Sequence, residues 1–254
     1  MGIRALGLSA PQWFGQANKP KVNNEKPGNR GQVKRGHPHA LKLILQGKKE
    51  EAIAYLKETA EFAVNPEHTQ LVLDIANGKP NAWKYDAETW PWKRALPNTS
   101  LKKDAPTDKF TIAFGGGSGY VPENERVWNT IGALDPRAVL LLGDNVYIDD
   151  PETPQMQRFH YNRRQSQPEW MRLAKRVPIY GIWDDHDFTP NDGWGGPALD
   201  EPKWKREVWE IFKENYDNPY YGGGDKQPGC WFDFWIGKVH FVLIDGRYYR
   251  ESPK

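Results

Sequence analysis

Short apolar runs alternate with amphipathic segments from residue 109 onward. Three continuous apolar runs predict buried strands at Phe110–Phe114, Ala138–Leu142 and Val177–Trp183. Apolar residues at helical spacing predict helices at Glu123–Leu134, Pro168–Lys175 and Lys203–Asn215. Apolar strands separated by helices are typical of a parallel sheet covered on both faces. The runs Cys230–Ile236 and Lys238–Asp245 flank Gly237 and predict a hairpin, so we expect an α/β fold with a mixed sheet.

The N-terminal part of the chain has a different pattern. Residues 1–36 contain three prolines among several Gly and Asn residues and are predicted to form an irregular tail. Residues 37–107 are predicted to be a small helical region followed by a Trp- and Pro-rich connection. Its helices are expected at His39–Gln46, Lys48–Ala63 and Pro66–Ala76. Three short helices cannot bury their own apolar residues, so we expect them to pack against residues 108–254.

Chemically active side chains follow the predicted strands where each one ends. Gly115–Gly119 follows the first strand, Asp144 the second, and Asp184-Asp185-His186-Asp187 the third. Ligand sites of open α/β sheets lie beyond the carboxyl ends of the strands, so these segments are expected to meet. Asp144 alone would equally suit a turn or a helix cap. The adjacent carboxylates repel one another unless a cation lies among them, which indicates a metal ion with His186 as a proton donor beside it.

Other motifs for ligand binding do not fit. The glycine run lacks the Gly-Lys-Ser/Thr of a nucleotide-binding P-loop. A calcium-binding EF-hand loop starting at Asp185 would need glycine where Pro190 stands. The His-Glu-x-x-His sequence of zinc proteases does not occur.

Four segments carry a family resemblance: Ile112-Ala-Phe-Gly, Leu142-Gly-Asp-Asn-Val-Tyr-Ile-Asp149, Ile182-Trp-Asp-Asp-His-Asp-Phe-Thr-Pro-Asn-Asp192 and Val242-Leu-Ile-Asp-Gly-Arg-Tyr-Tyr-Arg250. In order and spacing they resemble alkaline phosphatase D, a branch of the calcineurin-like metallophosphoesterases, over about residues 109–254. The resemblance implies a four-layer α/β/β/α sandwich. It also implies hydrolysis of phosphomonoesters or phosphodiesters by metal-activated hydroxide. The family closes its site with a later Gly-Asp-x-His-type segment, so residues 108–254 are expected to be the N-terminal part of a C-terminally truncated domain.

The resemblance also implies roles for individual residues. Asp144 would bridge the metals, and Tyr147 would be a phenolate ligand. Asp185 stands where relatives outside this branch have a metal-binding Asn. His186 would stabilise the transition state or protonate the leaving group. Residues expected to support the ligands or to contact phosphate are Asn145, Asp184, Asp187, Asn191 and Asp192.

Arginines are the expected partners of the substrate phosphate. Arg163 and Arg164, on the segment after Asp144, are the first candidates, and Arg247 and Arg250 are the next. An ion pair with the aspartate cluster, or a surface contact, is an equally good explanation for each. Backbone N–H groups at Gly116 and Gly117 would also suit phosphate, although a tight turn explains these glycines as well.

The implied cofactors are two or more metal ions chosen from Ca, Fe, Mn and Mg. The family usually has Ser-Cys after Phe-Gly, and the Cys binds iron. Here Gly116 and Gly117 stand in those places. The missing thiolate makes iron doubtful and favours calcium or another ion that prefers oxygen ligands.

Composition leaves two alternatives open. The 12 Trp residues also suit a calcium-dependent carbohydrate-binding module, and the missing ligands suit a catalytically inactive fragment or relative. The net charge of +2 indicates no specific nucleic-acid binding, and the single Cys230 permits no internal disulfide. The chain contains no apolar run of about 18 residues, and residues 1–30 lack the apolar core expected of a signal peptide. Family resemblance alone suggests a periplasmic or extracellular protein. The oligomeric state and the natural substrate stay open.

Overall fold

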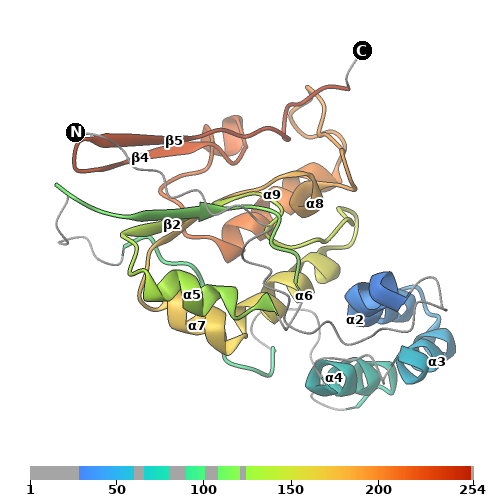
Figure 1. Cartoon of the computed structure of the whole chain (residues 1–254). Coiled ribbons are helices and arrows are strands. Elements are labelled where there is room, and N and C mark those ends of the chain that lie inside the picture. Colours follow the sequence, from blue (N-terminus) through green and yellow to red (C-terminus); the bar gives the residue numbers. More distant parts are fainter. Residues whose placement is uncertain (1–28, 60–65, 80–89, 101–107, 121–123, 253–254) are drawn as a thin grey trace.

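A three-stranded parallel sheet forms the centre of the protein. The computed structural model describes residues 29–59, 66–79, 90–100, 108–120 and 124–252 (Figure 1). The sheet order is β1 (Ile112–Gly115), β2 (Ala138–Leu142) and β3 (Ile179–Ile182). Leu142 pairs in register with Ile182, so β2 and β3 end side by side. The predicted strands are confirmed, with β1 and β3 shorter than their apolar runs.

Alternate residues of β2 face two different layers. Val139 and Leu141 belong to a core that includes Trp128 of α5 (Val127–Ala133) and Trp170 of α7 (Pro168–Ala174). Ala138 and Leu140 pack instead against the hairpin of β4 (Phe232–Ile236) and β5 (Val239–Leu243). Helices, parallel sheet and hairpin thus form successive layers (Figure 1). The predicted α/β fold is confirmed, but the expected mixed sheet is instead two separate sheets among the described residues, one parallel and one antiparallel, because β4 pairs only with β5.

The N-terminal helices form a core of their own that rests on the α/β part. They are α2 (Asn29–Leu45), α3 (Lys49–Thr59) and α4 (Pro66–Ala76). Leu41, Leu56 and Val72 share this core with Phe159 of α6 (Pro154–Gln165). The expected packing of the helices against the later part of the chain is therefore confirmed.

The boundary expected at residue 36 is wrong for the described residues. Helix α2 starts at Asn29 rather than His39 and runs through Pro38. A proline inside a helix removes one backbone hydrogen bond. Burial of Ala40 and Leu41 outweighs this loss. Residues 1–28 of the expected tail lie outside the described part of the chain.

Helices α6 (Pro154–Gln165) and α8 (Asp185–Phe188) were not predicted, and both contribute to the site. Helix α6 is rich in polar residues, yet His160, Asn162, Arg163 and Arg164 on it are buried. The short helix α8 (Asp185–Phe188) begins directly after β3, and α9 (Trp204–Asn215) packs against α6. A short 3₁₀ turn, η3, covers Gly224–Lys226.

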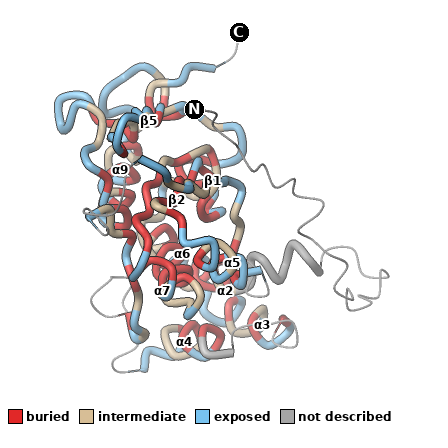
Figure 2. The backbone as a smooth tube through the Cα atoms, turned by 60° about the vertical axis from the view of Figure 1, so that its left-hand side comes forward, coloured by how far each residue is buried: buried red, intermediate tan, exposed pale blue. Residues whose placement is uncertain are grey.

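Burial is greatest where these elements meet. Figure 2 shows buried backbone through β2, α6 and α7, whereas β5 is largely exposed. Trp235 and Val242 are more than half exposed on the outer face of the hairpin. Among the described residues, no helix has both the length and the apolarity needed to cross a membrane.

Candidate metal centre

The ends of β2 and β3 bring two aspartate segments together. Both strands run in the same direction, so Asp144 and Asp184 leave the sheet at the same edge. Gly143, which precedes Asp144, has a positive φ of +104°. A Cβ atom at Gly143 would lie 2.5 Å from the Cβ of Asp184, so only glycine permits this approach. The meeting of segments predicted from the sequence is confirmed.

Three side chains at this edge have the geometry of a metal-binding group. Asp144, Asp185 and His186 each offer a ligand atom, and these atoms all lie within 4.8 Å of one another. Oδ1 of Asp144 is buried and accepts no hydrogen bond in the structure. An unpartnered buried carboxylate oxygen is costly, and a metal ion would satisfy it. The donor set therefore fits a metal ion.

Tyr147 closes one side of this group. Its hydroxyl donates to Oδ2 of Asp144 at 3.3 Å, and its ring lies 4.2 Å from the His186 ring. Burial raises the pKa of Tyr147 to about 12, and the negative charge of Asp144 adds to this effect. The phenol is therefore neutral in the metal-free protein, and a metal ion would have to displace its proton before the oxygen could bind as phenolate.

His186 is oriented by a residue to which the sequence analysis gave no role. Its Nδ1 lies 2.5 Å from Oδ1 of Asp149, so Nδ1–H donates to the carboxylate and Nε2 remains for the site. Burial lowers the pKa of His186, but the hydrogen bond and charge of Asp149, with the charges of Asp144 and Asp185, raise it above its ordinary value overall. Asp149 ends the second family motif, which was the available signal for it.

Three aspartates around the site have left-handed backbone conformations. The φ angles are +50° at Asp144, +57° at Asp149 and +58° at Asp192. Such conformations are uncommon outside glycine and concentrate at functional sites, although Asp adopts them more readily than most residues. Burial also raises the pKa of Asp144; His186 opposes this shift and the charge of Asp185 adds to it.

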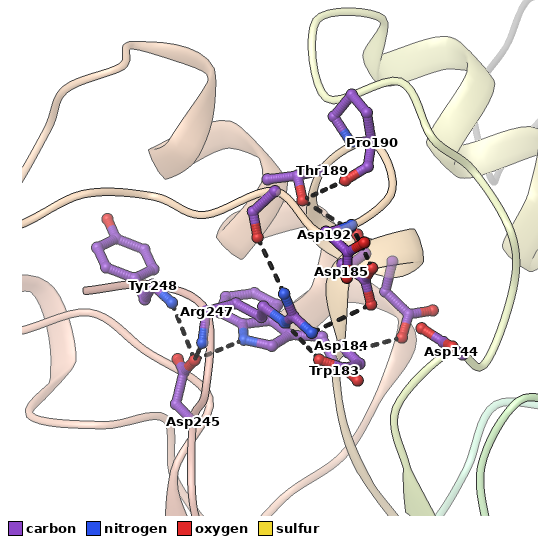
Figure 3. A network of polar contacts seen from close by, with 12 residues as sticks. Asp144, Trp183, Asp184, Asp185, Thr189, Pro190, Asp192, Asp245, Arg247 and Tyr248 are labelled. Carbon is purple, nitrogen blue, oxygen red and sulfur yellow. Dashed lines mark hydrogen bonds and ion pairs between the residues drawn. The ribbon is translucent and has the colours of Figure 1, made fainter. Parts of the chain in front are cut away.

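Arg247 contacts the acidic segment directly, as Figure 3 shows. Its Nε donates to Oδ1 of Asp184, and its Nη2 lies 3.2 Å from Oδ1 of Asp185. Its Nη1 donates to the carbonyl of Gly193 at 3.1 Å. The alternative of an ion pair with the aspartate cluster is therefore confirmed for Arg247. Arg250 is exposed, and among the described residues no ion pair involves its side chain.

The structure assigns Arg163 and Arg164 to other contacts. Arg164 is 4% exposed, pairs with Glu125 at 2.9 Å, and donates to the carbonyls of Ser118 and Asn145. The guanidinium of Arg163 is also buried and lies 4.0 Å from the centre of the Tyr120 ring. The expectation that these arginines hold substrate phosphate is therefore not supported. Arg164 instead joins the loops that follow β1 and β2.

Asn145 and Asp187 stabilise the fold beneath the site. Asp187 is buried and accepts the backbone N–H groups of Asn145, Val146 and Asp184. The side chain of Asn145 donates to Asp187 and to the carbonyl of Ile182. Burial raises the pKa of Asp187 to about 7, although the donated hydrogen bonds oppose this shift. Asp187 therefore supports the site from within, whereas Oδ1 of Asn145 is buried and accepts no hydrogen bond in the structure.

The remaining predicted residues lie in turns around the cluster. The backbone N–H of Gly117 donates to the carbonyl of Gly143 at 3.1 Å, so it is already used. A Cβ at Gly116 would lie 3.0 Å from that carbonyl, which supports the tight-turn alternative for both glycines. The backbone N–H of Asp192 donates to Oδ2 of Asp185 at 2.5 Å, and the Asn191 side chain donates to that of Asp192. Asp192 thus supports a candidate ligand through its backbone.

The donor atoms of the candidate group limit which metal ions it would bind. The group offers carboxylates and a histidine, which suits Mn, Mg, Ca or Fe by donor type. Cys230 is fully buried, and burial raises the pKa of its thiol well above the ordinary value. It therefore supplies no thiolate. Cys230, the one cysteine of the chain, thus does not replace the iron-binding cysteine that the family has at the position of Gly117.

Comparison with known proteins gives one structural likeness and no sequence match. No protein-family model matches the chain, and no curated protein matches it. A solved structure titled "Structure of PhoD" is similar, with a TM-score of 0.47 and 17% sequence identity. The likeness covers 58% of this chain and 34% of the other, so the chain spans about a third of that protein's length.

Proposed function

We propose that this chain carries a metal-dependent site for phosphoester hydrolysis, of the alkaline phosphatase D type. The observation that carries the proposal is the meeting of Asp144, Asp185 and His186 within 4.8 Å at the carboxyl edge of the sheet. Oδ1 of Asp144 is buried there and accepts no hydrogen bond in the structure, and a bound cation would satisfy it.

Asp144 and Asp185 would hold the metal, with Tyr147 as a further ligand. Bound metal ions of this kind polarise phosphate oxygens and lower the pKa of water. The carboxylates come from two different strand ends, so the sheet fixes their separation. Asp192 fixes the orientation of Asp185 through its backbone N–H. These contacts hold the ligand atoms before a metal arrives, which reduces the cost of binding.

His186 would protonate the oxygen of the leaving alcohol. Nδ1–H is directed to Asp149, so the second proton of the imidazolium is held at Nε2 and can pass to the leaving oxygen. Asp149 also stabilises the imidazolium by its charge. The same arrangement excludes the tautomer in which Nδ1 faces the substrate.

The two rival interpretations receive different support. A carbohydrate-binding module would need clustered surface Trp, but Trp90, Trp128, Trp170, Trp183 and Trp209 are all buried. Of the ten tryptophans in the described part of the chain, these five belong to the core and only Trp194 and Trp235 are exposed, so most of them are not available to a sugar. The inactive-fragment alternative keeps a specific observation in its favour, because the described residues offer one group of three candidate ligands and the proposed chemistry calls for two or more metals.

The expected four-layer sandwich is also part of this proposal. The packing of helices on one face of the parallel sheet and of the hairpin on the other supports it. The exposed outer face of β4 and β5 is where the family resemblance would place further structure.

The experiment compares His186→Ala with the wild-type chain. Metal content is measured after loading with Mn, Ca or Fe, and hydrolysis is followed with p-nitrophenyl phosphate and bis-p-nitrophenyl phosphate. We expect turnover to fall by roughly 10²–10⁴-fold while metal stays bound, because Asp144 and Asp185 are the proposed ligands and His186 is the proposed proton donor. His240→Ala is the matched control, since His240 forms a comparable pair with Asp233 on the exposed hairpin. No turnover by the wild-type chain with any of the metals would favour the inactive alternative.

A further inference from the structure

Arg247 joins three segments that surround the candidate metal group. Its contacts are with Asp184 at the start of α8, with Asp185 within α8, and with the carbonyl of Gly193 in the following loop. Among the described residues it is the only cation paired with Asp184 or Asp185. The side chains of Arg247 and Asp185 are each 9% exposed, so their contact is shielded from solvent, whereas the side chain of Asp184 is 42% exposed.

The backbone beside Arg247 is itself fixed. Oδ1 of Asp245 accepts the backbone N–H groups of Arg247 at 2.7 Å and Tyr248 at 3.0 Å, and the indole N–H of Trp183 at 2.9 Å (Figure 3). Its Oδ2 accepts the N–H of Cys230 at 2.7 Å. Asp245 therefore ties the segment that carries Arg247 to the end of β3, from which α8 starts.

Both oxygens of Asp185 are held by this arrangement. Oδ1 faces Arg247 at 3.2 Å, and Oδ2 accepts the N–H of Asp192 at 2.5 Å. An ionised carboxylate has about four lone-pair positions, so two contacts leave others for a metal ion. The orientation of the carboxylate is then determined by Arg247 and Asp192 together.

We infer that Arg247 is a positioning residue for the metal: it sets the orientation of Asp185 and thereby the metal affinity of the site. This inference rests on the function proposed above. If Arg247 only neutralised the aspartates, any positively charged side chain, including lysine, could replace it. Arg247 uses three nitrogens of its planar fork toward three different groups, which a lysine cannot reproduce.

The charge of Arg247 and its supporting contacts have opposite expected effects on metal affinity. Removing a positive charge beside an acidic group strengthens cation binding, whereas releasing a ligand from its supporting contact weakens it. Arg247→Lys keeps the charge and changes only the geometry. Arg247→Met removes both. The pair of variants therefore separates the two effects.

The test is a titration of each purified full chain with Mn²⁺ alone, with free Mn²⁺ followed by electron paramagnetic resonance. We expect the Kd of Arg247→Lys to rise by about 10–100-fold, the range found when groups that orient metal ligands are replaced. Arg247→Met should also bind more weakly, despite its lost charge. Arg172→Lys is the matched control, because Arg172 pairs with Glu169 and Asn129 on the exposed surface of α7.

Each outcome decides a separate question. An unchanged Kd for Arg247→Lys, or tighter binding by Arg247→Met, would overturn the positioning role and leave the proposed function intact. A wild-type chain that binds no Mn²⁺ would overturn the metal site itself, and the inference with it. Thermal unfolding of each variant shows that it is folded, and the lysine variant still decides the question if the methionine variant does not fold.

Discussion

Replacing Gly143 by Ala tests whether the close approach of two strand ends creates the site. Gly143 has φ +104°, and an added Cβ would lie 2.5 Å from the Cβ of Asp184 and 2.8 Å from its backbone nitrogen. Ordinary contacts between carbon atoms are about 3.5–4.0 Å. The loop after β2 must therefore move away from the start of α8 by about 1 Å.

Two effects of this change can be estimated. The positive φ angle costs an L-residue about 1–3 kcal/mol of folding stability. The displacement of about 1 Å separates Asp144 from Asp185 and His186, and a misplacement of that size costs about 10²-fold in catalysis. We expect weaker Mn²⁺ binding and a kcat/KM about 10²-fold lower, in a chain that remains folded.

The assays are Mn²⁺ titration and hydrolysis of bis-p-nitrophenyl phosphate, with thermal unfolding measured in parallel. Gly47→Ala is the control, because Gly47 also has a positive φ of +76° but has no atom within 4 Å of an added Cβ. It should lose stability and keep metal binding. Wild-type affinity and turnover in Gly143→Ala would refute the idea that this approach assembles the site.

Two other predictions concern side chains that the sequence did not single out. Asp149→Asn should lower turnover by about 10²-fold at unchanged Mn²⁺ affinity, because the amide can hold His186 in the wrong tautomer; a parallel loss of Mn²⁺ would instead make Asp149 part of the metal group. Burial lowers the pKa of His68 to about 2, with the charge of Arg163 adding to the effect. The folded-state pKa lies below the unfolded value of about 6.5, so the contribution of neutral His68 to stability is complete above pH 6.5 and is lost as the pH falls, by about 2–3 kcal/mol at pH 4.5. Melting temperatures at pH 7.5 and 4.5 should differ less in His68→Gln than in the wild-type chain, and equal differences would contradict this assignment.

The strands and their ends could be predicted because their signal is local. Apolar runs such as Ala138–Leu142 mark a buried strand whatever lies around them, and the structure has β2 at those residues. The direction of parallel strands then places Asp144 beside Asp184 and Asp185 without knowledge of any side-chain contact. The candidate metal group follows from these two facts.

The roles of the arginines could not be predicted, because they depend on partners far away in the sequence. Arg164 is buried on a polar helix because Glu125 and the carbonyl of Ser118 satisfy it. Arg247 was ranked below Arg163 and Arg164 as a phosphate contact, yet it is the one that reaches the aspartates. The local sequence does not indicate which carboxylate each of these three residues meets, because only the folded chain determines it.

Helix α6 links the site to the N-terminal helices. One part of it carries Arg164, which joins the loops after β1 and β2, and another carries Phe159, which completes the core of α2, α3 and α4. Unfolding of the N-terminal helices would expose Phe159 and loosen the helix that holds both loops. Helix α6 thus joins the candidate metal edge to the N-terminal helices, and we expect residues 108–254 alone to form a less ordered site than they do in the whole chain.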